Sequence, residues 1–134
     1  MRSGGDQESG FSAGYDTSSQ TVCVRAWGFW GADIASSFVR SVAAECSAAS
    51  RPVRLLVDVT RLLPQRNEGQ AAFGDLMTSV TMHGETSVAV VFSNTITKMQ
   101  LLRLAKERGV RNWAYFSSNL EAMAALARPQ TPRR

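Results

Sequence analysis

A set of polar and charged side chains comes from the ends of two predicted strands and the starts of the helices that follow them. The set comprises Asp58, Thr60, Arg61, Arg66, Asn67, Glu68, Ser93, Asn94 and Lys98. Open α/β sheets bind ligands in the crevice at the carboxyl ends of their strands, so we expect these side chains to lie near one another. Helix N-termini present free N–H groups there, and Arg66 and Lys98 add positive charge. The arrangement therefore predicts a site for an anionic group.

Two other interpretations of the same residues stay open. Asn67 or Asn94 can instead cap the helix that it begins, with the cations left in solvent. Asp58 and Glu68 form an alternative acid and base across the loop, although an acid at a strand end more often bonds to neighbouring backbone. No glycine-rich phosphate loop accompanies the set.

Three aromatic residues, Trp27, Phe29 and Trp30, crowd the end of the first clear strand. Rings at such a place can wall a pocket, anchor a partner or cover the open end of a small core. We expect Trp27 in the core and leave Phe29 and Trp30 open. One alternative therefore places an anionic or amphipathic small molecule between Trp30, Arg66 and Lys98.

Metal and cofactor chemistry find little support. His83 is the single histidine, and Cys23 and Cys46 fall in separate predicted elements without Cys-x-x-Cys spacing. Both thiols are interpreted as small buried hydrophobes. No nucleophile elbow and no cofactor signature occur in the sequence. We expect no metal and no cofactor.

The elements that must position these residues alternate along the chain. Apolar runs predict strands at 21–30, 53–59, 87–92 and 112–116. Phe11 and Tyr15, followed by turn residues, favour a short edge strand at 11–16. Helical spacing of apolar residues predicts helices over 33–48, from Glu68 to a cap at His83-Gly84, from Asn94 to Gly109, and over 120–127. Ser118 and Glu121 are spaced as a capping box. The order predicts a single α/β domain with a mixed, mostly parallel sheet of four to five strands and about four helices.

Length and composition agree with one domain. The chain has 134 residues, of which 44% are hydrophobic. No apolar run approaches the roughly 18 residues of a membrane span, and the N-terminus lacks the apolar core of an export signal, so a cytoplasmic location is expected. Residues 1–10 are mostly Gly, Ser and charge and predict a disordered tail, 11–127 the domain, and 128–134 a basic tail. The net charge of +4 comes from scattered cations and does not favour nucleic-acid binding.

Several segments resemble STAS domains. The step from the first strand through WGFWGAD into a helix, the segment LLVDVTRL before a helix, and SVAVVFSN before ITKMQLLRLA all resemble strand-to-helix steps of that family. The likeness covers about Phe11 to Ala127. More narrowly, the sequence is similar to SpoIIAA-like, STAS-like bacterial proteins, which are small single-domain chains.

The sequence departs from that family at one functional position. Anti-sigma factor antagonists carry a phosphorylatable Ser or Thr where the helix after the central strand opens. Here the segment Gln65–Gln70 reads QRNEGQ and holds no hydroxyl group. The resemblance therefore implies a partner surface without the family's phosphorylation switch.

The sequence thus predicts a non-catalytic regulatory or protein-binding module of the bacterial cytoplasm. The resemblance implies that the partner docks on the loop after the central strand and on the helix from Glu68. The first alternative is a protein that binds an anionic small molecule. The second is a small enzyme with Asp58 and Glu68 as acid and base. Homodimerisation through an edge strand or the aromatic end is a further expectation.

Overall fold

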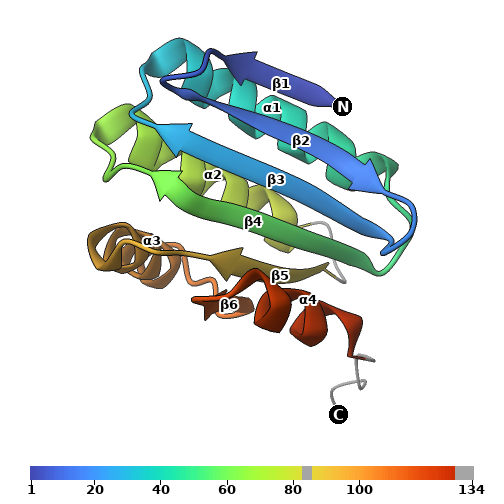
Figure 1. Ribbon diagram of the computed structural model, residues 1–134. Coiled ribbons are helices and arrows are strands. Elements are labelled where there is room, and N and C mark those ends of the chain that lie inside the picture. The colour runs from blue at the N-terminus through green and yellow to red at the C-terminus, as the bar shows by residue number, and fades with distance from the viewer. Residues whose placement is uncertain (83–85, 129–134) are drawn as a thin grey trace.

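The computed structural model describes residues 1–82 and 86–128, which form one six-stranded sheet with four helices (Figure 1). The strands are β1 (Arg2–Gly5), β2 (Gly10–Asp16), β3 (Thr21–Gly28), β4 (Val53–Leu62), β5 (Thr86–Val91) and β6 (Trp113–Phe116). The helices are α1 (Ala32–Ala48), α2 (Asn67–Met82), α3 (Thr95–Glu107) and α4 (Asn119–Ala127). The predicted α/β class and mixed sheet are confirmed.

The strands lie in the sheet in the same order as in the sequence. β1, β2 and β3 pair antiparallel, and β3 to β6 pair parallel. Right-handed crossovers that always step in one direction place every connecting helix on the same face. Accordingly α1, α2 and α3 share the core on one face, whereas α4, which connects no two strands, covers β4, β5 and β6 on the other. None of the four described helices lies over the face of β1–β3 opposite α1 (Figure 1).

The core beneath α1 and α2 is centred on four aromatic rings. Trp30 stacks on Phe73 with ring centroids 5.4 Å apart and lies 4.6 Å from the ring of Phe38. Phe11 meets Trp30 and Phe38 edge to face. Offset and edge contacts of this kind add to the large apolar area that such rings bury. The cluster ties β2, α1 and α2 to the end of β3.

Two predictions about the N-terminal part are wrong. The sheet has six strands rather than four to five, because Arg2–Gly5 pairs with Gly10–Ala13 instead of being disordered. Gly4 leaves room for the ring of Phe11, since a Cβ there would meet that ring. The strand expected at the edge, β2, therefore lies inside the sheet, and β1 is the edge.

The predicted helix ends are largely confirmed. Asn94 caps α3, accepting from the N–H groups of Ile96 at 2.8 Å and Thr97 at 3.4 Å. Ser118 caps α4 through the N–H of Glu121, and Gly109 follows α3 with φ +68°. The cap expected at His83-Gly84 lies outside the described residues, as does the basic tail beyond Arg128.

Within residues 1–82 and 86–128 no helix is both long and apolar enough to cross a membrane. In those same ranges no group of His, Cys, Asp and Glu side chains is placed to hold a metal ion.

Candidate functional site

A bulge at the end of β4 brings three of the predicted site residues onto the uncovered face of the sheet. Arg25 of β3 pairs with Asp58, but Trp27, two residues on, pairs with Arg61, three residues on. The extra residue shifts the alternation of β4 by one. Asp58, Thr60 and Arg61 consequently share a face, while Val59 and Leu62 are buried in the core.

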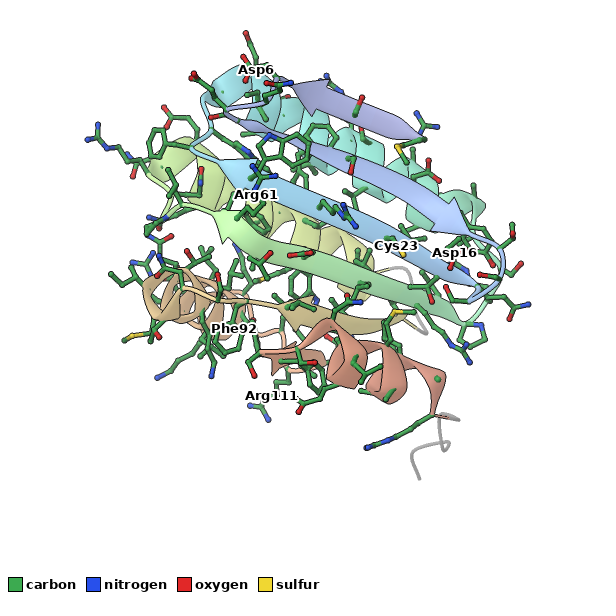
Figure 2. The ribbon with its side chains drawn as sticks, viewed as in Figure 1. Asp6, Asp16, Cys23, Arg61, Phe92 and Arg111 are labelled. Carbon is green, nitrogen blue, oxygen red and sulfur yellow. The ribbon has the colours of Figure 1, made fainter. Side chains whose placement is uncertain are left out.

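These three side chains line a depression of about 630 Å³, here called the open-face pocket. Its lining consists of Gln7, Ser12, Arg25, Ala26, Trp27, Asp58, Thr60 and Arg61. Figure 2 looks onto this face, with Arg61 in front of the strands and α1 and α2 behind them. The volume lies within the range of small-molecule sites in proteins.

Charges in the open-face pocket are incompletely paired. Asp58 Oδ1 accepts from the backbone N–H of Thr60 at 2.9 Å and from its hydroxyl at 2.6 Å. Among the described residues, the side chains of Arg25 and Arg61 make no hydrogen bond or ion pair, and Asp58 Oδ2 accepts no hydrogen bond. Two guanidinium groups are therefore available to an incoming anion.

The turn between β1 and β2 builds one rim of the open-face pocket. Asp6 Oδ1 accepts from the backbone N–H groups of Glu8 and Ser9, which closes the turn. The indole Nε1 of Trp27 donates to the backbone oxygen of Asp6 at 2.8 Å. The ring of Trp27 is thus fixed at the rim, and Gln7 lies beside it.

The core position expected for Trp27 belongs instead to Trp30, which the sequence left open. Trp30 is fully buried, and its Nε1 donates to the backbone oxygens of Gly10 and Trp27. Trp27, expected in the core, is half-buried and lines the pocket. Trp30 cannot touch a ligand, so the site expected between Trp30, Arg66 and Lys98 does not form.

A second surface lies where the parallel strands end, on the loop from β4 to α2. Gln65 holds this loop: its buried amide accepts from the N–H of Trp30 and donates to the backbone oxygens of Gly28 and Leu63. Its backbone exchanges two hydrogen bonds with the side chain of Gln100, at 2.9 and 3.0 Å. Gly69 leaves room for this amide, because a Cβ there would overlap it.

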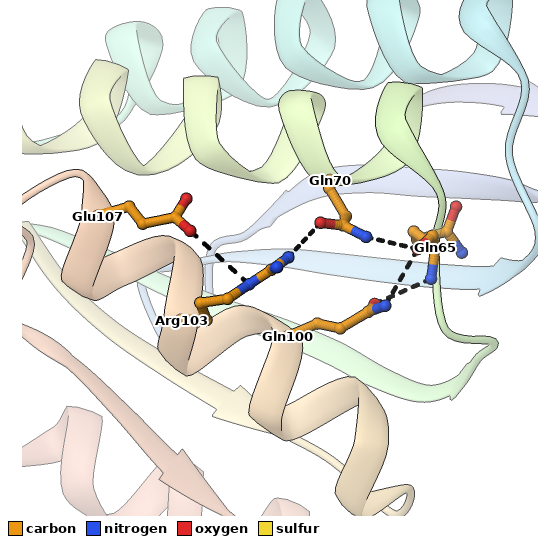
Figure 3. Close-up of polar contacts among 5 residues, drawn as sticks. All are labelled: Gln65, Gln70, Gln100, Arg103 and Glu107. Atoms are coloured by element: carbon orange, nitrogen blue, oxygen red, sulfur yellow. Dashed lines mark hydrogen bonds and ion pairs between the residues drawn. The ribbon is translucent and has the colours of Figure 1, made fainter.

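A chain of polar side chains extends the attachment of the loop to α2 and α3 (Figure 3). Gln70 donates to the backbone oxygen of Gln65 at 2.8 Å and accepts from Arg103. Arg103 in turn pairs with Glu107, with 3.8 Å between Nε and Oε1. Both neighbouring helices therefore hold the loop, and its exposed side chains project from a fixed backbone.

Four large apolar side chains are exposed around this loop. Phe29 is 41% exposed, Leu63 53%, Ile96 61% and Met99 63%. Leu63 lies beside the end of β3, where its N–H donates to Gly28, and the start of α3 reaches the loop through the bond from Thr97 Oγ1 to Leu62. With Arg66, these four residues are here called the carboxyl-end surface.

The predicted cations each lie over a ring of this region. The guanidinium carbon of Arg66 is 5.8 Å from the centroid of the Phe29 ring, and Lys98 Nζ is 4.6 Å from that of Phe92. Such cation–ring contacts hold a charge in place while leaving it exposed. The two cations therefore belong to separate contacts rather than to one anion site.

The other predicted site residues have mainly structural positions. Ser93 Oγ donates to the backbone oxygen of Thr60 at 2.6 Å, and Asn94 is the cap of α3. Asn67 and Glu68 are exposed at the start of α2, on the face away from Asp58. The geometry gives no support to Asp58 and Glu68 as a paired acid and base.

Five pocket residues were not predicted as site residues: Gln7, Ser12, Arg25, Ala26 and Trp27. A signal for two of them was present, since alternation in β3 already places Arg25 and Trp27 on the face opposite Val22, Val24 and Ala26. The alternation alone does not show that none of the described helices covers the pocket.

Comparison with known proteins returned no match. No family model, no curated protein and no solved structure matches this chain.

Proposed function

We propose that this protein is a non-catalytic, STAS-like binding module of the bacterial cytoplasm that docks a protein partner on the carboxyl-end surface. The observation that carries the proposal is the exposure of Phe29, Leu63, Ile96 and Met99 around one fixed loop. Exposed apolar side chains gathered at one place, beside a cation, are typical of interaction surfaces.

The charges at this surface define the partner. Arg66 lies over Phe29, and Lys98 over Phe92 in the strand-to-helix step beside it, so a docked chain meets apolar side chains and cations together. A partner that presents apolar side chains flanked by carboxylates complements both. Glu68 lies in the first turn of α2 and would repel a carboxylate of the partner placed next to it.

The fixed loop favours binding over catalysis. Side chains on a loop that Gln65, Gln70 and Gln100 hold from both sides lose little freedom when a partner docks. Binding through exposed apolar contacts needs no proton transfer. Asp58 and Glu68, the acid and base considered for catalysis, lie on different faces of the sheet.

Reversal of one charge tests the proposal. Arg66→Glu is expected to abolish capture of the partner from lysate of the source organism, because it puts a carboxylate against the partner's carboxylates. The melting temperature should hardly change, since Arg66 is exposed. Capture is read by quantitative mass spectrometry with wild-type and variant baits.

Arg111→Glu is the matched control. Arg111 is exposed and precedes β6, at the opposite end of the parallel strands from Arg66. The control makes the same charge change and should retain the partner. If both variants capture the partner as the wild type does, or both lose it equally, the carboxyl-end surface is not the docking site.

A further inference from the structure

We propose that the open-face pocket binds a small organic anion, a carboxylate or phosphate carried on a flat apolar body. The pocket lies on the sheet face that α1, α2 and α3 do not cover, and it shares no residue with the carboxyl-end surface. The proposal is therefore independent of the docked protein partner.

The two guanidinium groups supply the anion site. Arg25 and Arg61 lie on neighbouring strands, at adjoining register positions of the β3–β4 pair, and both line the pocket. Neither is paired within the described residues, although Asp58 is close by in the same lining. Asp58 is instead engaged by Thr60. Guanidinium groups match the planar oxygens of carboxylate and phosphate, often through two hydrogen bonds.

The ring of Trp27 supplies the apolar wall. Its Nε1 is bound to Asp6, so the ring is held at the rim rather than free to move. A half-buried indole fixed in this way offers contact area at little entropic cost. A ligand whose flat body packs against the Trp27 ring would direct its anionic group toward the two arginines.

Polar groups around the wall set a further requirement. Asp58 Oδ2, the Ser12 hydroxyl and the Gln7 amide line the pocket without a hydrogen-bond partner among the described residues. A hydroxyl or amine on the ligand body can donate to Asp58 Oδ2. The presence of such a donor would distinguish ligands within the class. The anionic group and the flat apolar body define the class itself.

The test is calorimetric titration of the full chain with 2-naphthoate, 2-naphthyl phosphate and neutral 2-naphthol at about 0.15 M salt. The variants are Arg25→Gln, Arg61→Gln and the double variant. Arg54→Gln is the control, because Arg54 is on β4 but does not line the pocket. Thermal melts of each variant check that the fold is retained.

At least one anion should bind, and each pocket variant should weaken it about tenfold, as expected for loss of a charge-assisted hydrogen bond. The double variant should lower the affinity to that of 2-naphthol, and Arg54→Gln should have no effect. The stronger of the two anions identifies carboxylate or phosphate as the group bound. Equal binding of naphthol and the anions, equal loss in Arg54→Gln, or no binding of either anion would overturn the proposal.

Discussion

At the scale of single residues, Trp27 and Trp30 have opposite roles although both come from the same strand end. Gly28 lies between them with φ +76°, and this left-handed residue interrupts the alternation of β3. Trp27 still follows the strand and faces the pocket, whereas Trp30 is turned into the core. Side-chain periodicity predicts orientation only within a regular strand, which is why the sequence left Trp30 unassigned. Trp27 follows the alternation of β3, and its expected place in the core was wrong because its large ring was given more weight than that alternation.

Gln65 is the residue whose importance the sequence did not reveal. Its side-chain amide is buried and forms hydrogen bonds with backbone groups of Trp30, Gly28 and Leu63. Gln65→Ala should lower the free energy of unfolding by about 2–3 kcal/mol, because buried backbone groups lose their partners. Urea denaturation measures the change. Gln7→Ala removes an exposed amide and is the control; a Gln65→Ala loss no larger than that of the control would contradict the assigned role.

Tyr115 predicts a pH effect on stability. Its hydroxyl is buried without a partner in the described structure, and burial raises its pKa to about 12 from 10.0. Between these values the unfolded chain ionises first, so this contribution to stability is complete below about pH 10 and is lost as the pH rises toward 12.

The measurement is the urea midpoint of wild type and Tyr115→Phe at several values between pH 9 and 11.5. The wild type should lose stability relative to the variant above pH 10, and at pH 7 the variant should cost nothing, since it removes an unpaired hydroxyl. If the difference between the urea midpoints of wild type and Tyr115→Phe stays constant from pH 9 to 11.5, the raised pKa of the buried Tyr115 hydroxyl is contradicted.

At the scale of elements, the β1–β2 turn and the end of β3 approach one another at Gly28. A Cβ at Gly28 would overlap the backbone oxygen of Glu8 and the side chain of Ser9, and φ is positive. Gly28→Ala should therefore destabilise the fold by roughly 1–3 kcal/mol and loosen the rim of the open-face pocket. Thermal and urea melts measure the loss.

Gly31→Ser is the matched control for that variant. Gly31 is the N-cap of α1, has φ −89° and has free space around its Cβ position. Serine there can accept from the first turn of the helix, so the control should be neutral or slightly stabilising. If Gly28→Ala has the same melting temperature as Gly31→Ser, the close approach at Gly28 does not contribute to stability.

The elements themselves could be predicted where local signals are strong. The apolar run of β4, the stripe of α1 and the caps Asn94 and Ser118 each show in the sequence. β1 could not be predicted, because Arg-Ser-Gly-Gly has no apolar alternation and is a strand only through its pairing with β2. The bulge of β4 also depends on its neighbour and leaves no local signal.

At the scale of the whole molecule, the predicted site residues separate into two surfaces. Asp58, Thr60 and Arg61 belong to the open-face pocket, whereas Arg66 belongs to the carboxyl-end surface. The sequence predicts that these residues lie near one another in one site, whereas the structure divides them between these two surfaces. The sequence does not show that α4 packs mainly on β4, β5 and β6 and so leaves most of the same face of β1–β3 uncovered by the described helices.

The most direct measurement of the central claim is site-specific crosslinking at the carboxyl-end surface. A photo-crosslinking amino acid replaces Leu63, and in a second protein it replaces Leu120, which is 80% exposed on α4 on the other side of the sheet. Each is irradiated in lysate, with and without Arg66→Glu. We predict a crosslinked protein partner from position 63 that is absent from position 120 and lost with Arg66→Glu. The same products from both positions, or a product from position 63 that survives Arg66→Glu, would contradict docking at this surface.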